Sequence, residues 1–202
     1  MPQSPPVVAI VGLPGAGKSE VANYFVRHGF AYLRFGQITL DEVKRRGLEP
    51  TEANERQIRE ALRQEHGMAA FAKLNAPAID KFLAEGKNVL IDGLYSWSEY
   101  KFLKEKYGEA LMVLAVYAPP EVRYARLTNR HTRHGDDHNL KYRSFSREDA
   151  QARDYAQIEN IEQAGPIAMA DHTIINTGSI EDLEKDLARV WQEINPAPFL
   201  KE

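Results

Sequence analysis

The residues with the clearest chemical potential form one short run near the N-terminus: Gly12, Leu13, Pro14, Gly15, Ala16, Gly17, Lys18 and Ser19. This run fits the pattern G-x-x-x-x-G-K-[ST], in which glycines let the backbone wrap around phosphates and its N–H groups point at them. Lys18 adds a positive charge that can follow a γ-phosphate, and the Ser19 hydroxyl can ligate Mg²⁺. The run therefore predicts a phosphate-binding loop (P-loop) whose eight residues bind ATP, with Lys18 catalytic and Ser19 on the metal.

The flanks of this loop support the interpretation. Val7–Val11 is a continuous apolar run, typical of a strand buried on both faces of a parallel sheet. Residues 18–28 are predicted to be a helix, whose N-terminus adds partial positive charge near a phosphate. A glycine-rich turn with an accidental Lys-Ser is the alternative, and the strand-loop-helix context disfavours it.

An acidic residue, Asp92, ends a second apolar run and is followed by Gly93. Ligands bind at the edge of a parallel sheet where the strands have their carboxyl ends. We therefore expect Asp92 to hold Mg²⁺ with Ser19, directly or through water, and to take part in catalysis. The alternative is a simple Asp-Gly turn at the end of a strand.

Arginines recur after residue 120, at Arg123, Arg126, Arg130, Arg133, Arg143, Arg147 and Arg153. Spacings of three and four predict that Arg123, Arg126 and Arg130 share one helix face. Arginines that close over phosphates stabilise the charge of phosphoryl transfer. We expect Arg126 and Arg130 to be catalytic and to bind ATP. The alternative is a solvated basic face paired with acidic neighbours such as Glu121.

Five strand-like segments, at 7–11, 30–35, 88–92, 111–117 and 172–176, alternate with predicted helices at 18–28, 41–46, 51–63, 68–85, 96–106, 120–130, 146–163 and 179–193. Alternation of this kind predicts a three-layer α/β/α fold, that of the P-loop NTPases, with a five-stranded parallel sheet in one domain. We assign the core to 7–35, 87–130 and 147–195. Residues 36–86 are a helical insertion, and 131–146 are a polar loop.

Together these motifs, with Arg46-Gly47-Leu48, Ile91-Asp92-Gly93, and Ile175-Asn176, resemble the P-loop nucleotide kinases. The likeness is strongest to an adenylate-kinase-related, dephospho-CoA-kinase-like family known mainly from archaea. The resemblance implies an acceptor-binding insertion at about 36–86 and an arginine-bearing lid at about 131–146. It also implies transfer of the ATP γ-phosphate to a nucleotide or nucleotide-like acceptor, with Asn176 and Gly178 near the base.

Two departures from the family pattern concern the acceptor. Phe35-Gly36-Gln37 stands where such kinases carry Gly-Asp with a nearby arginine, and Leu94-Tyr95-Ser96 stands where an arginine follows the strand. Both changes remove expected contacts to an acceptor monophosphate, which argues against AMP. Contacts to another acceptor are expected from Gly36, Gln37, Arg63, Tyr95 and Arg133.

The composition narrows the remaining classes of function. The 202-residue chain has a formal net charge of −3 and no cysteine, so disulfides and thiolate metal sites are excluded. We expect a cytoplasmic monomer or homodimer whose partner is a small-molecule phosphate acceptor, with no nucleic acid and no membrane. An ATP-hydrolysing switch remains an alternative, whereas an ATPase acting on nucleic acid is disfavoured by the acidic charge.

Overall fold

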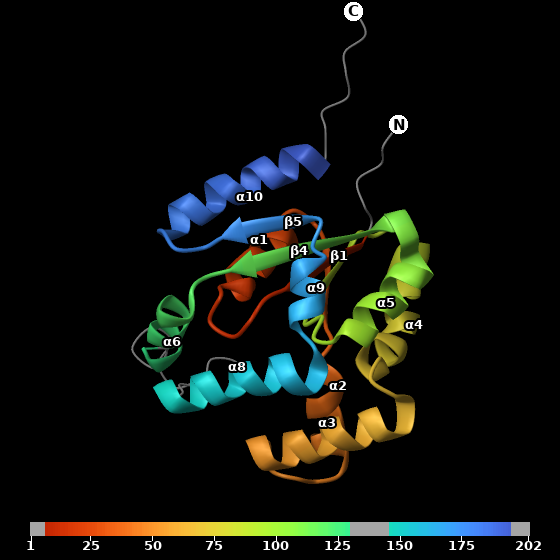
Figure 1. The fold of residues 1–202 in the computed structure, drawn as a ribbon. Coiled ribbons are helices and arrows are strands. Elements are labelled where there is room, and N and C mark those ends of the chain that lie inside the picture. The colour runs from red at the N-terminus through yellow and green to blue at the C-terminus, as the bar shows by residue number, and fades with distance from the viewer. Residues whose placement is uncertain (1–6, 130–145, 195–202) are drawn as a thin grey trace, which may run out of the picture.

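The computed structural model describes residues 7–129 and 146–194. Its elements follow in this order: β1 (Val7–Val11), α1 (Lys18–Arg27), β2 (Ala31–Arg34), α2 (Gln37–Arg45), α3 (Glu52–His66), α4 (Ala70–Ala84), β3 (Val89–Asp92), α5 (Trp97–Tyr107), η1 (Gly108–Ala110), β4 (Leu111–Tyr117), α6 (Pro120–Thr128), α8 (Arg147–Ile161), α9 (Ala164–Ala168), β5 (His172–Ile175) and α10 (Ile180–Ile194). Figure 1 shows their arrangement.

The five strands form one parallel sheet in the order β2-β3-β1-β4-β5. The predicted five-stranded parallel sheet is thus confirmed. The register places Asp92 of β3 beside Ile10 of β1 on one side and beside Arg34 of β2 on the other. The carboxyl end of β3 therefore lies next to the strand that leads into the P-loop.

Helices cover both faces of the sheet because the strands are apolar on both sides. Val8 and Ile10 of β1 pack with α1 and α10, whereas Val7, Ala9 and Val11 pack with α4 and α5. All five residues of β1 are inaccessible to solvent. A strand buried on both faces reads as an unbroken apolar run, which explains why it was visible in the sequence.

The remaining helices gather near the carboxyl ends of the strands. Helix α2 begins three residues after β2, and α6 begins three residues after β4. Helix α8 packs against α6, and α2 packs against α3 (Figure 1). These four helices therefore surround the edge of the sheet at which the P-loop and Asp92 lie.

Most helix boundaries lie within two or three residues of their predicted positions. The sequence prediction missed the first turn of α2, which begins at Gln37, and all of α9. Ser96 supplies a capping box for α5, accepting from the backbone of Glu99, whose side chain returns to the Ser96 amide. The short α9 has neither an amphipathic period nor a side-chain cap, so the sequence carried no signal for it.

Candidate functional site

The P-loop connects β1 to α1, and two of its glycines are required by its shape. Gly15 and Gly17 have φ values of +80° and +104°. A Cβ atom at Gly15 would lie 2.6 Å from the carbonyl oxygen of Arg123, and one at Gly17 would lie 2.2 Å from the Asn176 Nδ2 atom. Both positions therefore combine a left-handed backbone with contacts that leave no space for a side chain. The loop ends at the first turn of α1, and the N-terminus of a helix is a favourable place for an anion.

Lys18 extends back over the loop that precedes it. Its Nζ atom donates hydrogen bonds to the carbonyl oxygens of Gly12 at 2.7 Å and Leu13 at 3.2 Å. The ammonium group thus lies at the opening residues of the loop and not in solvent beyond α1. A full positive charge beside helix-terminal amides makes this a place suited to an anionic phosphate.

Asp92 is held at the carboxyl end of β3 by a neighbour from β2. The Tyr32 hydroxyl donates a hydrogen bond of 2.6 Å to Asp92 Oδ2. Burial and the nearby Asp92 carboxylate both raise the pKa of Tyr32, so the phenol remains protonated and keeps donating. This hydrogen bond restricts how the Asp92 carboxylate can turn.

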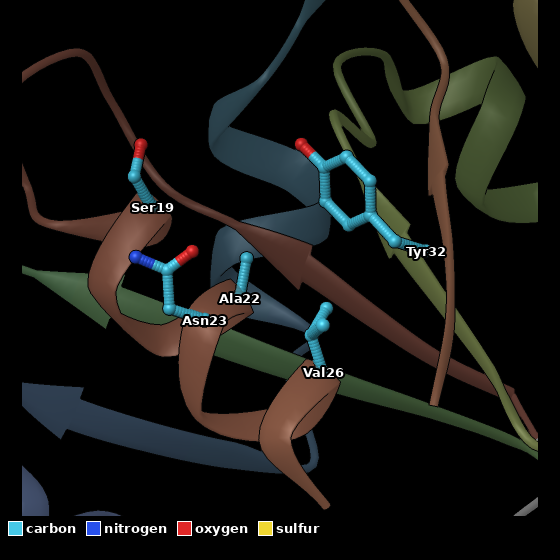
Figure 2. Close-up of a pocket in the computed structure, with 5 residues that line it drawn as sticks. All are labelled: Ser19, Ala22, Asn23, Val26 and Tyr32. Carbon is cyan, nitrogen blue, oxygen red and sulfur yellow. The ribbon is translucent and has the colours of Figure 1, made fainter. Parts of the chain in front are cut away.

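A cavity of about 190 Å³ lies between α1 and β2, lined by Ser19, Ala22, Asn23, Val26 and Tyr32. Figure 2 shows Ser19 at the start of α1 with Asn23 one turn farther along, and Tyr32 reaching from β2 with its hydroxyl end turned toward α1. The cavity is therefore polar at the P-loop end and apolar toward Val26. Tyr32 joins this cavity to Asp92 through its hydrogen bond.

The donor set at this place fits Mg²⁺. The Ser19 hydroxyl and the Asp92 carboxylate are hard oxygen ligands, and Mg²⁺ in phosphate-transferring sites takes few protein ligands beside water and substrate phosphates. Among the residues that the structure describes, no group of three or more His, Cys, Asp or Glu side chains could hold a metal ion by itself. A metal here would depend on the phosphates of a bound nucleotide.

The predicted acceptor residues fall into two groups. Gly36 and Tyr95 are neighbours, since a Cβ atom at Gly36 would lie 3.8 Å from the Tyr95 hydroxyl. Gln37, in contrast, donates at 2.9 Å to Asp41 on its own helix. The ring of Tyr95 folds back over Gly93, where a Cβ atom would meet it at 2.6 Å. The turn after β3 therefore presents Tyr95 to the beginning of α2.

The Arg63 and Glu99 side chains interact electrostatically with each other and with Tyr95. The Arg63 Nε and Glu99 Oε1 atoms are buried and have no hydrogen-bond partner among the described residues. The other oxygen of Glu99 accepts from the amides of Tyr95 at 2.9 Å and Ser96 at 3.1 Å. Burial raises the pKa of Glu99 to about 7, against the opposing influence of these amides and of Arg63. Arg63 lies close enough to Tyr95 to interact with it electrostatically, and it also packs on Phe71.

Sequence reasoning missed two arginines on this side. Burial raises the pKa of Tyr95 to about 12, the Asp92 charge adds to this rise, and the positive charges of Arg34 and Arg153 oppose it. Arg34 comes from the end of β2 and Arg153 from α8, so two distant segments bring positive charge to one tyrosine. The signal for Arg34 in the sequence was its place near the end of the second predicted strand, and the structure pairs it with Asp92.

The arginines predicted on one face of α6 differ in their burial. Arg123 is buried, with 3% of its surface exposed, and Arg126 is only partly exposed. Although the spacing predicts one helix face for Arg123 and Arg126, the Arg123 side chain is buried against the carboxylate of Asp154. Arg147 pairs with Glu121 at 2.7 Å, as the alternative interpretation of the arginines anticipated. The predicted residues Arg130, Arg133 and Arg143, and the predicted lid at 131–146 except for its last residue, lie outside the described residues.

Asn176 lies beneath the P-loop. Its Nδ2 atom donates at 2.8 Å to the carbonyl oxygen of Ala16, and the residue is 7% exposed. The structure thus shows Asn176 supporting the loop backbone. Gly178 lies over Asp182, whose Oδ2 would be 2.9 Å from a Cβ atom at that position. Ser179 accepts from the Asp182 amide at 3.1 Å and so has the predicted capping role for α10.

With this geometry in place, comparison with known proteins is informative. A sequence model described as AAA domain matches residues 8–156. The UPF0200 protein of Thermococcus gammatolerans is 35% identical over 189 residues, which cover 93% of this chain and 95% of that protein. This chain belongs to the UPF0200 family. Thermococcus gammatolerans is an archaeon, in keeping with the resemblance to a family known mainly from archaea.

Solved structures confirm the fold of this UPF0200 protein. The shikimate kinase of Bacteroides thetaiotaomicron has a TM-score of 0.56 at 17% identity, covering 95% of this chain and 98% of that one. The dephospho-CoA kinase of Campylobacter jejuni has a TM-score of 0.51 at 17% identity, covering 93% and 96%. At such identities the likeness establishes the P-loop kinase fold alone. Within the described residues, no helix is long and apolar enough to cross a membrane.

Proposed function

We propose that this protein is an ATP-dependent phosphotransferase that moves the γ-phosphate of ATP to a nucleotide or nucleotide-like acceptor. The observation that carries the proposal is the convergence at one sheet edge of Lys18, Ser19 and Asp92 with the positive charges near Tyr95. The first three suit a Mg²⁺-bound triphosphate. The arginines on the Tyr95 side suit a second anionic substrate.

Each residue would have a defined task in such a reaction. The loop amides and Lys18 bind the β- and γ-phosphates, and Ser19 and Asp92 would hold Mg²⁺, which supplies charge neutralisation when bound. Arg126 of α6, together with Arg130, would neutralise charge on the transferred group. Phosphoryl transfer depends mainly on positioning and electrostatic stabilisation, and these residues would supply both.

The acceptor side differs from the nucleotide side in its chemistry. Arg34 and Arg153 bring positive charge to Tyr95. Arg63 and Glu99 also lie close enough to interact with Tyr95 electrostatically. An acceptor with a phosphate or carboxylate would be attracted to these arginines, and Asp92 would orient its attacking oxygen. The bond from that oxygen to the γ-phosphorus forms as the bond between the γ-phosphorus and the β,γ-bridging oxygen breaks, leaving ADP. Where the attacking group is a hydroxyl, its proton passes to the Asp92 carboxylate.

The test is an acceptor panel with purified protein and Mg-ATP. AMP, CMP, dCMP, UMP, GMP and dephospho-CoA are added singly, and ADP and the phosphorylated acceptor are measured by chromatography. We expect one acceptor to raise ADP well above the background without acceptor. A slow background that no acceptor changes would favour an ATP-hydrolysing switch and count against the transferase.

Lys18→Ala gives the matched test of the active site. Removing the ammonium that donates to the Gly12 and Leu13 carbonyls should lower turnover by orders of magnitude, because this charge lies on the loop that would hold the phosphates. Lys185→Ala is the control, since Lys185 is exposed on α10 and its ion pair among the described residues is with Asp182 of the same helix. Normal turnover by a folded Lys18→Ala protein would contradict the assignment.

A further inference from the structure

Arg123 is buried in α6 at the base of the P-loop, although arginine is rarely buried unless it is paired. Its Nε donates to the carbonyl oxygen of Ala118 at 2.9 Å, and its Nη1 donates to the carbonyl oxygen of Pro14 at 3.1 Å. The same guanidinium forms a forked pair with Asp154 of α8, at 2.8 Å from Nη1 and 2.6 Å from Nη2. One side chain therefore joins the P-loop, α6 and α8.

The carboxylate of Asp154 is held from a second direction. The Tyr124 hydroxyl donates to Asp154 Oδ2 at 3.0 Å. Burial raises the pKa of Tyr124, and the hydrogen bond to Asp154 raises it further, so the phenol remains a donor. Asp154 and Arg123 are each 3% exposed. The pair is thus enclosed and fixed in orientation.

The P-loop rests on Arg123 at two consecutive residues. Pro14 accepts the guanidinium hydrogen bond, and Gly15 lies so close to the backbone of Arg123 that a Cβ atom would be 2.6 Å from its carbonyl oxygen. The bend of the loop therefore depends on where α6 lies. Helix α6 is in turn held to α8, its neighbour in Figure 1, through Asp154.

We propose that Arg123 and Asp154 are a positioning pair that holds residues 14–17 in the conformation that binds phosphate. The inference rests on the proposed function only in that the loop binds Mg-ATP, and Arg123 acts through the loop backbone. A buried ion pair adds little net stability compared with apolar residues of the same size, but it fixes geometry. The planar guanidinium can serve Pro14, Ala118 and both carboxylate oxygens together, which a lysine ammonium cannot.

The experiment measures the Kd of Mg-ATP by calorimetry, and Tm separately, for wild type, Arg123→Lys and Asp154→Asn. The control is Leu103→Ala, which truncates a fully buried side chain of α5 packed in the other core cluster. We expect both pair variants to raise the Kd at least about tenfold, since a displacement of about 1 Å in a positioning group can cost about a hundredfold. Leu103→Ala should lower Tm and change the Kd by no more than about twofold, because the sites are independent.

A purely stabilising role predicts a different result. Pair variants with a lowered Tm and an unchanged Kd, like Leu103→Ala, would overturn the inference. If both pair variants fail to fold, Tyr124→Phe decides, because it removes only the hydroxyl that orients Asp154; a raised Kd supports the inference and an unchanged Kd overturns it. Wild-type protein that binds no Mg-ATP would overturn the proposed function and this inference together.

Discussion

Glu99 makes the stability of this protein depend on pH in a direction opposite to that of most carboxylates. Its side chain is fully buried at the start of α5, and burial raises its pKa from 4.5 to about 7. Between these two values the folded chain binds a proton that the unfolded chain has released. Stability from this group is therefore present at low pH and is lost as the pH rises through about 7.

The magnitude follows from the two pKa values. Each pKa unit corresponds to about 1.4 kcal/mol, so a rise from 4.5 to about 7 lowers the free energy of unfolding by about 3 kcal/mol once the pH is well above 7. Between pH 5 and pH 8 the expected loss is about 2–3 kcal/mol, because unfolded chains are already partly ionised at pH 5. Glu99→Gln keeps an oxygen to accept from the Tyr95 and Ser96 amides and cannot ionise.

The assay is urea unfolding of wild type and Glu99→Gln at pH 5, 6, 7 and 8, with the difference between the two proteins plotted against pH. From pH 5 to pH 8, the free energy of unfolding of the variant should rise relative to that of the wild type by about 2–3 kcal/mol. Glu60→Gln is the control, because Glu60 is exposed and Arg56 lowers its pKa. Its pH dependence therefore falls mainly below pH 5, and the difference between wild type and Glu60→Gln should stay nearly flat from pH 5 to pH 8. A difference between wild type and Glu99→Gln that stays flat from pH 5 to pH 8 would refute the reasoning.

Two further substitutions test the nucleotide side. Gly17→Ala should abolish Mg-ATP binding, because its Cβ atom would lie 2.2 Å from Asn176 Nδ2. Gly29→Ala is the control, because Gly29 has a similar φ of +87° with open space around it. This control should lose about 1–2 kcal/mol of stability and still bind Mg-ATP. Calorimetry with Mg-ATP compares the two, and equal affinities would count against the packing argument. Tyr32→Phe removes the hydrogen bond to Asp92 and should lower kcat about tenfold with about 1 kcal/mol lost from the folding free energy; unchanged kcat would show that Asp92 needs no such support.

The sheet and the P-loop could be predicted because their signals are local. Val7–Val11 and Leu111–Tyr117 are unbroken apolar runs. Such runs are typical of strands that are covered by other elements on both faces. The P-loop pattern specifies backbone angles that only glycine adopts readily, so its identity follows from residue types alone. Helix boundaries followed from caps such as Thr51 and Ser146, whose side chains accept from the amides three residues later.

The acceptor side could be predicted only in outline, because strand order is not contained in local spacing. The arrangement β2-β3-β1 places Arg34 beside Asp92 and brings Tyr32 into contact with it. In the sequence these residues are separated by about sixty positions with three helices between them, so no short pattern relates them. The approach of Arg153 to Tyr95 likewise depends on the packing of α8.

The sequence by itself determined that this protein has a P-loop, a parallel sheet and an acidic residue at the end of a strand, because each of these depends on a few consecutive residues. Only the tertiary structure decided which arginine is buried. Helical spacing placed Arg123 and Arg126 on one face, but the spacing is the same whether that face meets solvent or a carboxylate. Asp154 lies 31 residues from Arg123, and its arrival from α8 turns one arginine into a buried support for the P-loop.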